Sequence, residues 1–259
     1  MNRIEKTFAE LRKAGRKALV GYLTAGDPTI AESERNIQEA LENGLDILEL
    51  GVPFSDPTAD GPTIQAASQR ALAGGMTLEK TLTLAGRLRK DFETPIVLFG
   101  YSNPFFGRGY ERVSREAAEA GVDGLLIVDL PFEEKDEFCG ALERQGLCYI
   151  PLVAPTTSPE RAKRMLKGAQ GFVYYIMVKG VTGARARLAA DAAKCVKALR
   201  RQTNLPIAAG FGVKDGAQAR QAAMFADGVV VGSALVEAAR KGKLAALVHE
   251  IREGLGKDS

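Results

Sequence analysis

The sequence has very few of the residues on which several kinds of enzyme chemistry depend. Among its 259 residues there is one histidine, His249, and no tryptophan. A Ser-His-Asp triad, a zinc site built from several histidines or a His-carboxylate iron site would have to use that single side chain. It lies in the segment LAALVHEIREGL, where we expect an ordinary helical residue. Acid–base chemistry is therefore expected from carboxylate, lysine, tyrosine or cysteine side chains.

Cysteines, excess charge and long apolar runs are scarce as well. Cys139, Cys148 and Cys195 form no CxxC pair, and an odd number without a secretion signal is typical of a reduced, intracellular protein. Lys and Arg total 35 against 32 Asp and Glu, spread along the chain, so nothing favours nucleic-acid binding. No apolar run approaches the roughly 18–20 residues that span a bilayer. We expect a cytoplasmic protein that does not enter a membrane.

The chain does contain a regular alternation of apolar and amphipathic segments. Short runs rich in β-branched residues are typical of strands buried on both faces. They occur at 18–25, 45–51, 95–101, 122–129, 147–154, 171–177, 205–212 and 227–234. The amphipathic stretches between them predict helices, and Ser158 before Pro159 is a good helix start.

Eight strands alternating with helices over about 250 residues predict a (β/α)8 TIM barrel. We expect one α/β catalytic domain over residues 1–259. Ile4, Phe8 and Leu11 lie at helical spacing and predict a short extra helix at the N-terminus. An open doubly wound sheet is the alternative, but it usually carries GxGxxG after its first strand, and here that strand ends in TAGDPT.

The second predicted strand, LDILELG, carries a carboxylate near its C-terminal end. Because side chains alternate along a strand, we expect Glu49 to point the same way as Leu45 and Ile47. A buried carboxylate is costly unless it is paired or protonated, and desolvation raises its pKa, which suits proton transfer. Barrel enzymes work at this end of their strands, so Glu49 is a candidate acid or base. The alternative is a structural glutamate bonded to the backbone or to an arginine.

The loop that follows, PFSDPTADGP, holds Asp56 and Asp60. Either one alone is typical of a turn. Taken with Glu49, however, a loop carboxylate and a strand carboxylate can flank a substrate as acid and base.

Two glycine turns, in GFGVKDGAQA and VGSALVE, run from a strand toward a helix. Such turns let backbone N–H groups approach an anion, and barrels often bind phosphate after strands seven and eight.

The segment LELGVPFSDPTADGP resembles the signature of the tryptophan synthase alpha chain family. The resemblance continues, in order, through YLTAGDP (22–28), FGYSNP (99–104), IVDLPFEE (127–134), PLVAPTT (151–157), GVTGAR (180–185), AAGFGV (208–213) and GSALVE (232–237). It covers nearly the whole chain. It implies a (β/α)8 barrel lyase that cleaves indole-3-glycerol phosphate to indole and glyceraldehyde 3-phosphate in L-tryptophan biosynthesis.

The resemblance also implies the site residues. The family's active-site tyrosine lies eight residues before the threonine of GVTG, which is Thr182 here. The implied catalytic residues are Glu49, Asp60 and Tyr174. The implied substrate-binding residues are Tyr22, Phe99 and Phe211 around the indole, and Gly183, Gly212, Gly232 and Ser233 at the phosphate. Two departures, Thr58 for an aliphatic residue and MVK at 177–179 where a serine is common, bear on loop closure.

The resemblance implies that this chain holds no metal and no organic cofactor. It implies that indole passes to a partner beta chain carrying pyridoxal phosphate, in an α2β2 heterotetramer. Three alternatives stay open: a stand-alone lyase that releases indole, a Schiff-base aldolase using a lysine such as Lys179, and a non-catalytic subunit that regulates a partner. Loops 53–62 and 178–188 have few apolar anchors, as mobile lids do, so we expect the isolated chain to be a poor catalyst.

Overall fold

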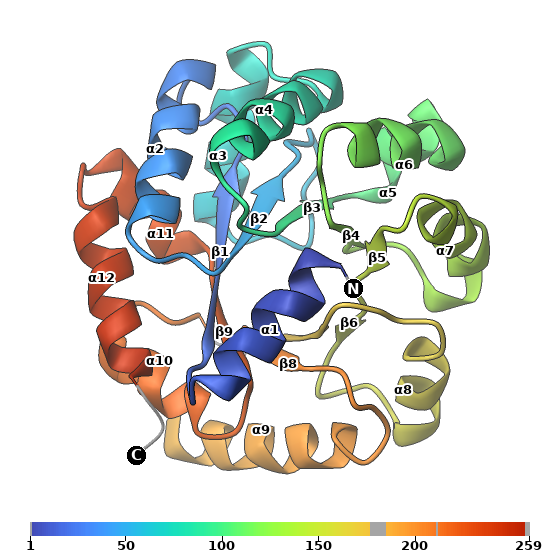
Figure 1. The fold of residues 1–259 in the computed structure, drawn as a ribbon, viewed down its shortest axis with the longest axis vertical. Coiled ribbons are helices and arrows are strands. Elements are labelled where there is room, and N and C mark those ends of the chain that lie inside the picture. Colours follow the sequence, from blue (N-terminus) through green and yellow to red (C-terminus); the bar gives the residue numbers. More distant parts are fainter. Residues whose placement is uncertain (1, 177–184, 211, 257–259) are drawn as a thin grey trace.

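The computed structural model describes residues 2–176, 185–210 and 212–256, with 185–191 described by their backbone alone. Strands lie at the centre of a ring of helices (Figure 1). The strands are β1 (Ala18–Thr24), β2 (Ile47–Gly51), β3 (Ile96–Gly100), β4 (Gly124–Ile127), β5 (Cys148–Tyr149), β6 (Leu152–Val153), β7 (Val173–Ile176), β8 (Ile207–Gly210) and β9 (Gly228–Val231). All eight predicted strand segments therefore form strands.

The helices follow the strands in the order that the amphipathic pattern predicts. They are α1 (Arg3–Lys13), α2 (Ile30–Glu42), α3 (Pro62–Ala73), α4 (Leu78–Asp91), α5 (Ser102–Arg108), α6 (Tyr110–Glu119), α7 (Lys135–Arg144), α8 (Pro159–Met165), α9 (Arg185–Leu199), α10 (Gly216–Ala223), α11 (Ser233–Arg240) and α12 (Leu244–Leu255), with a short 3-10 turn at Phe132–Glu134. The Ser158 side chain caps α8 by accepting from the Arg161 N–H, as its sequence indicates.

The sheet is parallel throughout and runs in the order β5-β4-β3-β2-β1-β9-β8-β7-β6. Its two end strands, β5 and β6, are the halves of one predicted strand, interrupted at Ile150 and Pro151. Pro151 has no N–H to donate to a ladder, but its carbonyl accepts from Tyr174 N at 3.0 Å, while Ile150 N donates to the Leu125 carbonyl at 3.0 Å. This segment thus bonds to β4 on one side and β7 on the other. It closes the sheet and confirms the (β/α)8 barrel.

Helix α1 fills the amino end of the barrel. It lies across the centre of the strand ring in Figure 1, and its side chains Ile4, Phe8 and Leu11 are buried among the inward-facing residues of the strands. Asn2 caps the helix and forms a capping box with Glu5. The predicted N-terminal helix is confirmed, and its apolar side chains fill this end of the barrel interior.

The alternation along β2 sets the direction of Glu49. Ile47 packs inside the barrel, whereas Leu48 and Leu50 pack against the outer helices. The expectation for Leu45 is wrong, because this residue precedes β2 and packs in the outer cluster with Leu48. Strand alternation holds only within the strand, and the chain turns at Leu45 before β2 begins.

Three aspartates, Asp46, Asp123 and Asp227, hold the amino end of the barrel by one repeated arrangement. Each directly precedes a strand, accepts a backbone N–H of the neighbouring strand at 2.7 to 2.9 Å, and pairs with an arginine. The partners are Leu19 and Arg252 for Asp46, Ile96 and Arg89 for Asp123, and Ile207 and Arg200 for Asp227. These bonds fix the positions of adjacent strands.

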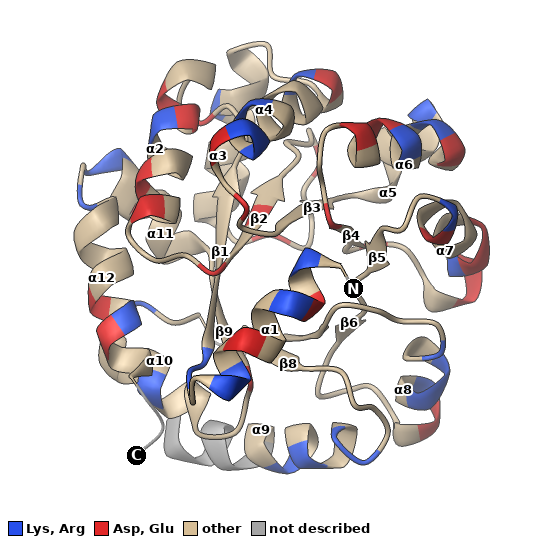
Figure 2. Ribbon diagram, in the orientation of Figure 1, with Lys and Arg blue, Asp and Glu red and all other residues tan. Residues whose placement is uncertain are grey.

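Acidic and basic residues are mixed over the outer helices (Figure 2). His249 lies on α12, its side chain is largely exposed, and it contacts Glu253 at 3.2 Å. The prediction of an ordinary helical histidine is confirmed. Within the described ranges, no helix is both long enough and apolar enough to cross a bilayer.

Candidate active site

Glu49 lies at the middle of β2, inside the barrel and toward its carboxyl end. It pairs with Tyr22 of β1 and Val97 of β3, and its side chain has no exposure to solvent. Neither carboxylate oxygen has a hydrogen-bond partner among the described residues. Loss of water around the carboxylate raises the pKa of Glu49 to about 8. The structural alternative, a glutamate bonded to backbone or arginine, therefore does not describe this residue.

Asp60 lies on the loop between β2 and α3. Its side chain is half-buried, and burial raises the pKa of Asp60 to about 6, while a hydrogen bond from Tyr101 lowers it. The Gln65 side chain donates to the Asp60 carbonyl at 2.9 Å and ties the loop to α3. Asp56 is exposed and bonds to the neighbouring Ser55 at 2.5 Å. The structure thus separates the two loop aspartates, and Asp60 is the one held near the barrel mouth.

Three aromatic side chains line the interior beside Glu49. Tyr22 contacts Phe99 edge to face, with ring centroids 5.1 Å apart, and Phe99 lies 6.5 Å from Tyr174. Burial, followed by the negative charges of Glu49 and Asp60, keeps the pKa of Tyr174 well above its ordinary value. The Tyr174 hydroxyl therefore stays protonated at neutral pH, and both carboxylates contribute to its raised pKa.

The two adjacent tyrosines of β7 face opposite ways. Tyr174 points inward, next to Phe99, whereas Tyr175 is buried in the outer cluster between β7 and helices α8 and α9. Gly210 on β8 makes room for Tyr174, because a Cβ there would lie 2.8 Å from its hydroxyl oxygen. Of the two tyrosines, only Tyr174 faces the interior that holds Glu49.

Three of the predicted phosphate residues, Gly212, Gly232 and Ser233, lie on two turns that precede helices. Gly232 is the N-cap of α11 and has no side chain that could cap the helix. The backbone N–H groups of the first turn, which begins at Ser233, therefore have no side-chain acceptor and can bind an anion. A Cβ on Gly232 would lie 3.6 Å from Tyr22 Cβ, so this turn lies beside the aromatic side chains that line the interior.

The other turn precedes α10. Gly212 has φ of 63°, in the left-handed region that glycine favours. Helix α10 begins at Gly216, and the Asp215 side chain caps it by accepting from the Gln218 N–H. That N–H is therefore not free to bind an anion. Gly212 can offer an anion its own backbone N–H.

Several predicted residues lie outside the described part of the chain. They are Gly183, Phe211, Thr182, Lys179 and the MVK segment at 177–179. Tyr101, which contacts the Asp60 loop, is not among the residues predicted from the sequence. Its position directly after an apolar strand, within FGYSNP, is the signal that could have indicated it.

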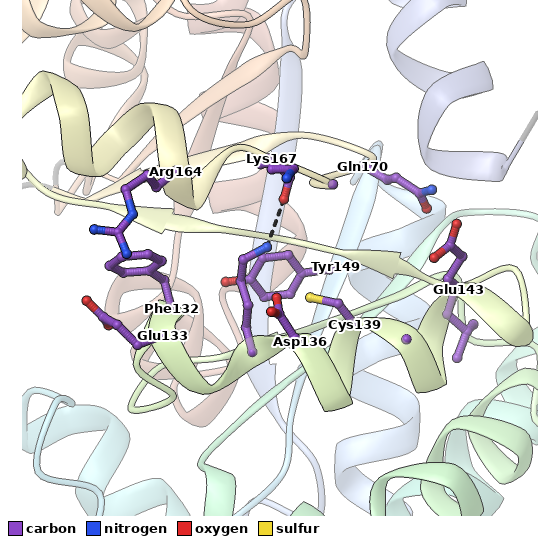
Figure 3. A pocket seen from close by; sticks show the side chains of 13 residues that line it. Phe132, Glu133, Asp136, Cys139, Glu143, Tyr149, Arg164, Lys167 and Gln170 are labelled. Atoms are coloured by element: carbon purple, nitrogen blue, oxygen red, sulfur yellow. Dashed lines mark hydrogen bonds between the residues drawn. The ribbon is translucent and has the colours of Figure 1, made fainter.

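A cavity of about 610 Å³ lies outside the barrel, between α7 and the segment around α8 (Figure 3). Lys135 crosses it and donates to the Lys167 carbonyl at 2.8 Å, with its ammonium 5.3 Å from the centre of the Tyr149 ring. Burial raises the pKa of the Cys139 thiol to about 11, so this cysteine stays protonated. The Lys135 ammonium is already bound and the Cys139 thiol is not activated, so this cavity is a weaker candidate than the barrel mouth.

No group of three or more His, Cys, Asp and Glu side chains within the described ranges is arranged to hold a metal ion. The three cysteines are free thiols. Burial raises the pKa of Cys148 to about 12, which makes it a poor nucleophile. The groups available for chemistry at this site are therefore the acid–base side chains in the barrel mouth.

Comparison with known proteins agrees with this geometry. The family model for the tryptophan synthase alpha chain matches residues 8–253. The tryptophan synthase alpha chain of Geobacter sulfurreducens is 49% identical, with 99% of this chain and 100% of the relative covered, and that of Dechloromonas aromatica is 47% identical, with 98% of each covered.

Solved structures show the same similarity. Tryptophan synthase from Mycobacterium tuberculosis superposes with a TM-score of 0.93 at 37% identity, covering 100% of this chain and 99% of the other. The alpha subunit from Legionella pneumophila has a TM-score of 0.90 at 39% identity, with 98% of each chain covered. The described barrel, its buried carboxylate and these matches over almost the full length lead to one conclusion: the chain belongs to the tryptophan synthase alpha chain family.

Proposed function

We propose that Glu49, Asp60 and Tyr174 carry out in this chain the reaction of its family, the cleavage of indole-3-glycerol phosphate to indole and glyceraldehyde 3-phosphate. The observation that carries the proposal is the state of Glu49. It is fully buried, neither of its oxygens has a partner in the described structure, and its pKa is raised to about 8. An unpartnered buried carboxylate is costly, and a substrate that bonds to it supplies the missing partner.

The reaction needs a proton to be delivered and then removed. Indole C3 is protonated first, which makes the ring electron-poor and lets the bond to the glycerol side chain break. The side-chain hydroxyl then loses its proton as the aldehyde forms. With a pKa of about 8, Glu49 is mostly protonated at neutral pH and can deliver the first proton. The carboxylate that results then removes the second, so Glu49 is regenerated after each turnover.

Asp60 and Tyr174 support this proton transfer. With a pKa of about 6, Asp60 is mostly ionised at neutral pH. Its carboxylate accepts from the indole N–H and stabilises the positive charge that develops on the ring. Tyr174 keeps its proton and faces the same interior, where its hydroxyl positions the substrate or Glu49.

The substrate's two ends would lie on different parts of the mouth. Tyr22 and Phe99 form an aromatic wall beside Glu49, suited to the flat apolar indole. The open first turn of α11 at Gly232 and Ser233, with the backbone of Gly212, suits the phosphate dianion. We propose that Gly183 and Phe211 join the phosphate and indole ends, as the family resemblance implies.

The product indole is apolar and would be lost if it were released into water. Membership of the family implies a beta-chain partner that takes it up. We propose that pyridoxal phosphate belongs to that partner alone, that the two chains form an α2β2 heterotetramer, and that this chain works without a cofactor of its own. A cytoplasmic location stays a prediction from the sequence.

The test is turnover of indole-3-glycerol phosphate by the purified chain, alone and with a beta chain loaded with pyridoxal phosphate. We expect slow indole formation alone and a clear increase with the partner. Equal, fast rates in both cases would favour the stand-alone lyase. Inactivation by borohydride in the presence of substrate would favour a Schiff-base aldolase, and no indole under any condition would favour a non-catalytic regulatory subunit.

A further inference from the structure

Tyr101 lies where the loop after β3 meets the loop that carries Asp60. It is the N-cap residue of α5 and its side chain is 3% exposed. Its ring stacks on Phe54 of the Asp60 loop, with centroids 5.3 Å apart and planes at 28°. The ring therefore anchors one end of that loop.

The Tyr101 hydroxyl anchors the other end. It accepts the backbone N–H of Ala59 at 3.0 Å, so its own proton is free to be donated. The carboxylate of Asp60 belongs to the next residue in the chain, and a hydrogen bond from Tyr101 lowers its pKa. One hydroxyl thus contacts the backbone before Asp60 and interacts with the Asp60 side chain.

Tyr101 is itself fixed from its other side. The next residue, Ser102, donates to the Asp129 carboxylate through its backbone N–H at 2.7 Å and through its hydroxyl at 3.0 Å. Asp129 follows β4, so contacts run from the loop after β4, through the start of α5, to Asp60. The tyrosine is a fixed support that does not move freely with the loop.

Asp60 needs such a support because of where it lies. It stands on neither a helix nor a strand, in a loop of prolines, glycine and small residues. A carboxylate must be held within about half an ångström of its working position to stabilise charge efficiently. The Gln65 bond holds the main-chain carbonyl of Asp60, and among the described residues Tyr101 is the group whose hydrogen bond acts on the carboxylate.

We propose that Tyr101 is a positioning residue, which aims the Asp60 carboxylate at the indole nitrogen through its hydroxyl and secures the loop through its ring. The inference rests on the proposed role of Asp60. Tyr101 acts through Asp60 and does not itself touch the reacting atoms.

The hydroxyl also affects the ionisation of Asp60. Burial raises the pKa of Asp60, and the Tyr101 bond counters part of that rise. The other titratable groups that face this cluster are Tyr22 of β1, Tyr174 of β7 and Glu49 of β2. Both tyrosines keep their protons, because burial holds the pKa of each far above neutrality. Removing the Tyr101 hydroxyl should therefore move the pKa of Asp60 upward.

The experiment begins with Tyr101→Phe, which keeps the stacked ring and removes only the hydroxyl. We expect kcat to fall by about 10- to 100-fold, the effect of a hydrogen bond to a charged group, with a smaller change in KM. The acidic limb of the rate profile should move to higher pH. Tyr110→Phe is the matched control, since it removes a tyrosine hydroxyl from the adjacent helix, and its kinetics should equal those of the wild type. Urea unfolding checks that each variant is folded.

Repeating the change in an Asp60→Asn background separates this inference from the proposed function. We expect Asp60→Asn alone to be severely impaired and Tyr101→Phe to add less than twofold to that loss. Two outcomes would overturn the inference alone. In the first, Asp60→Asn is severely impaired but Tyr101→Phe is normal. In the second, Tyr101→Phe causes an equal loss in both backgrounds. A nearly normal Asp60→Asn overturns the proposed role of Asp60 and the inference with it.

Discussion

Asp123 and Glu49 are buried carboxylates at opposite ends of the same barrel, 2% and 0% exposed. Asp123, at the amino end, bonds to Arg89 at 2.9 Å, to Arg3 at 3.2 Å and to the Ile96 N–H at 2.9 Å. Glu49, toward the carboxyl end, has no hydrogen-bond partner within the described structure. Burial alone therefore does not separate a structural carboxylate from a functional one, but the presence of partners does.

The difference indicates that the carboxylates at the amino end stabilise the fold, whereas Glu49 is available for reaction. Asp46 and Asp227 repeat the arrangement of Asp123, each with a backbone donor and an arginine. A carboxylate with such partners holds adjacent strands together. A carboxylate without them destabilises the folded chain but can exchange a proton with a ligand. Five predictions break or sharpen this comparison.

The largest effect is expected for Glu49→Gln. The amide keeps the shape and cannot titrate, so kcat should fall by about 10²- to 10⁴-fold. Initial rates of indole formation measure this, and circular dichroism should show an intact fold. Near-normal turnover would end the assignment of Glu49 as the proton donor and acceptor.

The same variant tests the effect of Glu49 on stability. Its folded pKa of about 8 lies above the ordinary value of 4.5, so the folded state binds the proton more tightly than the unfolded chain does. Wild-type stability should therefore be highest below about pH 4.5 with respect to this group, and should fall as the pH rises to about 8. Urea titrations across this range should show a loss of a few kcal/mol in the wild type that Glu49→Gln lacks.

Asp123→Asn should lower the stability of the fold without lowering turnover, the opposite of the main effect expected for Glu49→Gln. It leaves the half-buried Arg89 without its charge partner, and breaking a buried pair in this way costs roughly 3–5 kcal/mol in the free energy of unfolding. Turnover by the folded fraction should not change. Urea midpoints compared with those of the exposed control Asp91→Asn measure the loss. An unchanged midpoint would show that the aspartates at the amino end do not stabilise the barrel.

Ser233→Asp places a negative charge in the first turn of α11. The helix dipole tolerates this charge, so stability should be kept. Beside a bound phosphate dianion, however, it should raise KM for indole-3-glycerol phosphate about tenfold or more, through like-charge repulsion. The inhibition constant for indole, which has no phosphate, should change little. Equal weakening of both ligands would place the phosphate elsewhere.

The smallest effect is expected for Tyr174→Phe. The ring still packs against Phe99, so the loss in turnover should be a fewfold to about tenfold, as for one neutral hydrogen bond. Tyr175→Phe is the matched control, because this neighbour is buried against the outer helices and does not face Glu49. It should lower stability slightly and leave turnover unchanged. A damaging Tyr175→Phe beside a silent Tyr174→Phe would reverse the assignment.

Much of the barrel could be predicted because its signals are local. The continuous apolar runs mark all eight strand segments, and the spacing of Ile4, Phe8 and Leu11 marks α1. The division of the fifth segment at Pro151 and the outward packing of Leu45 were not predicted. Both depend on where a strand begins or is interrupted, which neighbouring strands decide.

For the candidate site, the sequence by itself determined the order of strands and helices. It thereby determined that Glu49 lies toward the carboxyl end of its strand, and that Tyr174 and Tyr175 lie on opposite faces of β7. Period-two alternation and chain order are properties of the sequence alone. Only the tertiary structure decided that Glu49 has no hydrogen-bond partner among the described residues while Asp123 has three. It also decided that Asp215 caps α10 and that Tyr101 lies against the loop of Asp60. The reason is physical: burial, desolvation and hydrogen bonding depend on groups brought together from separate strands, and no local pattern records which groups those are.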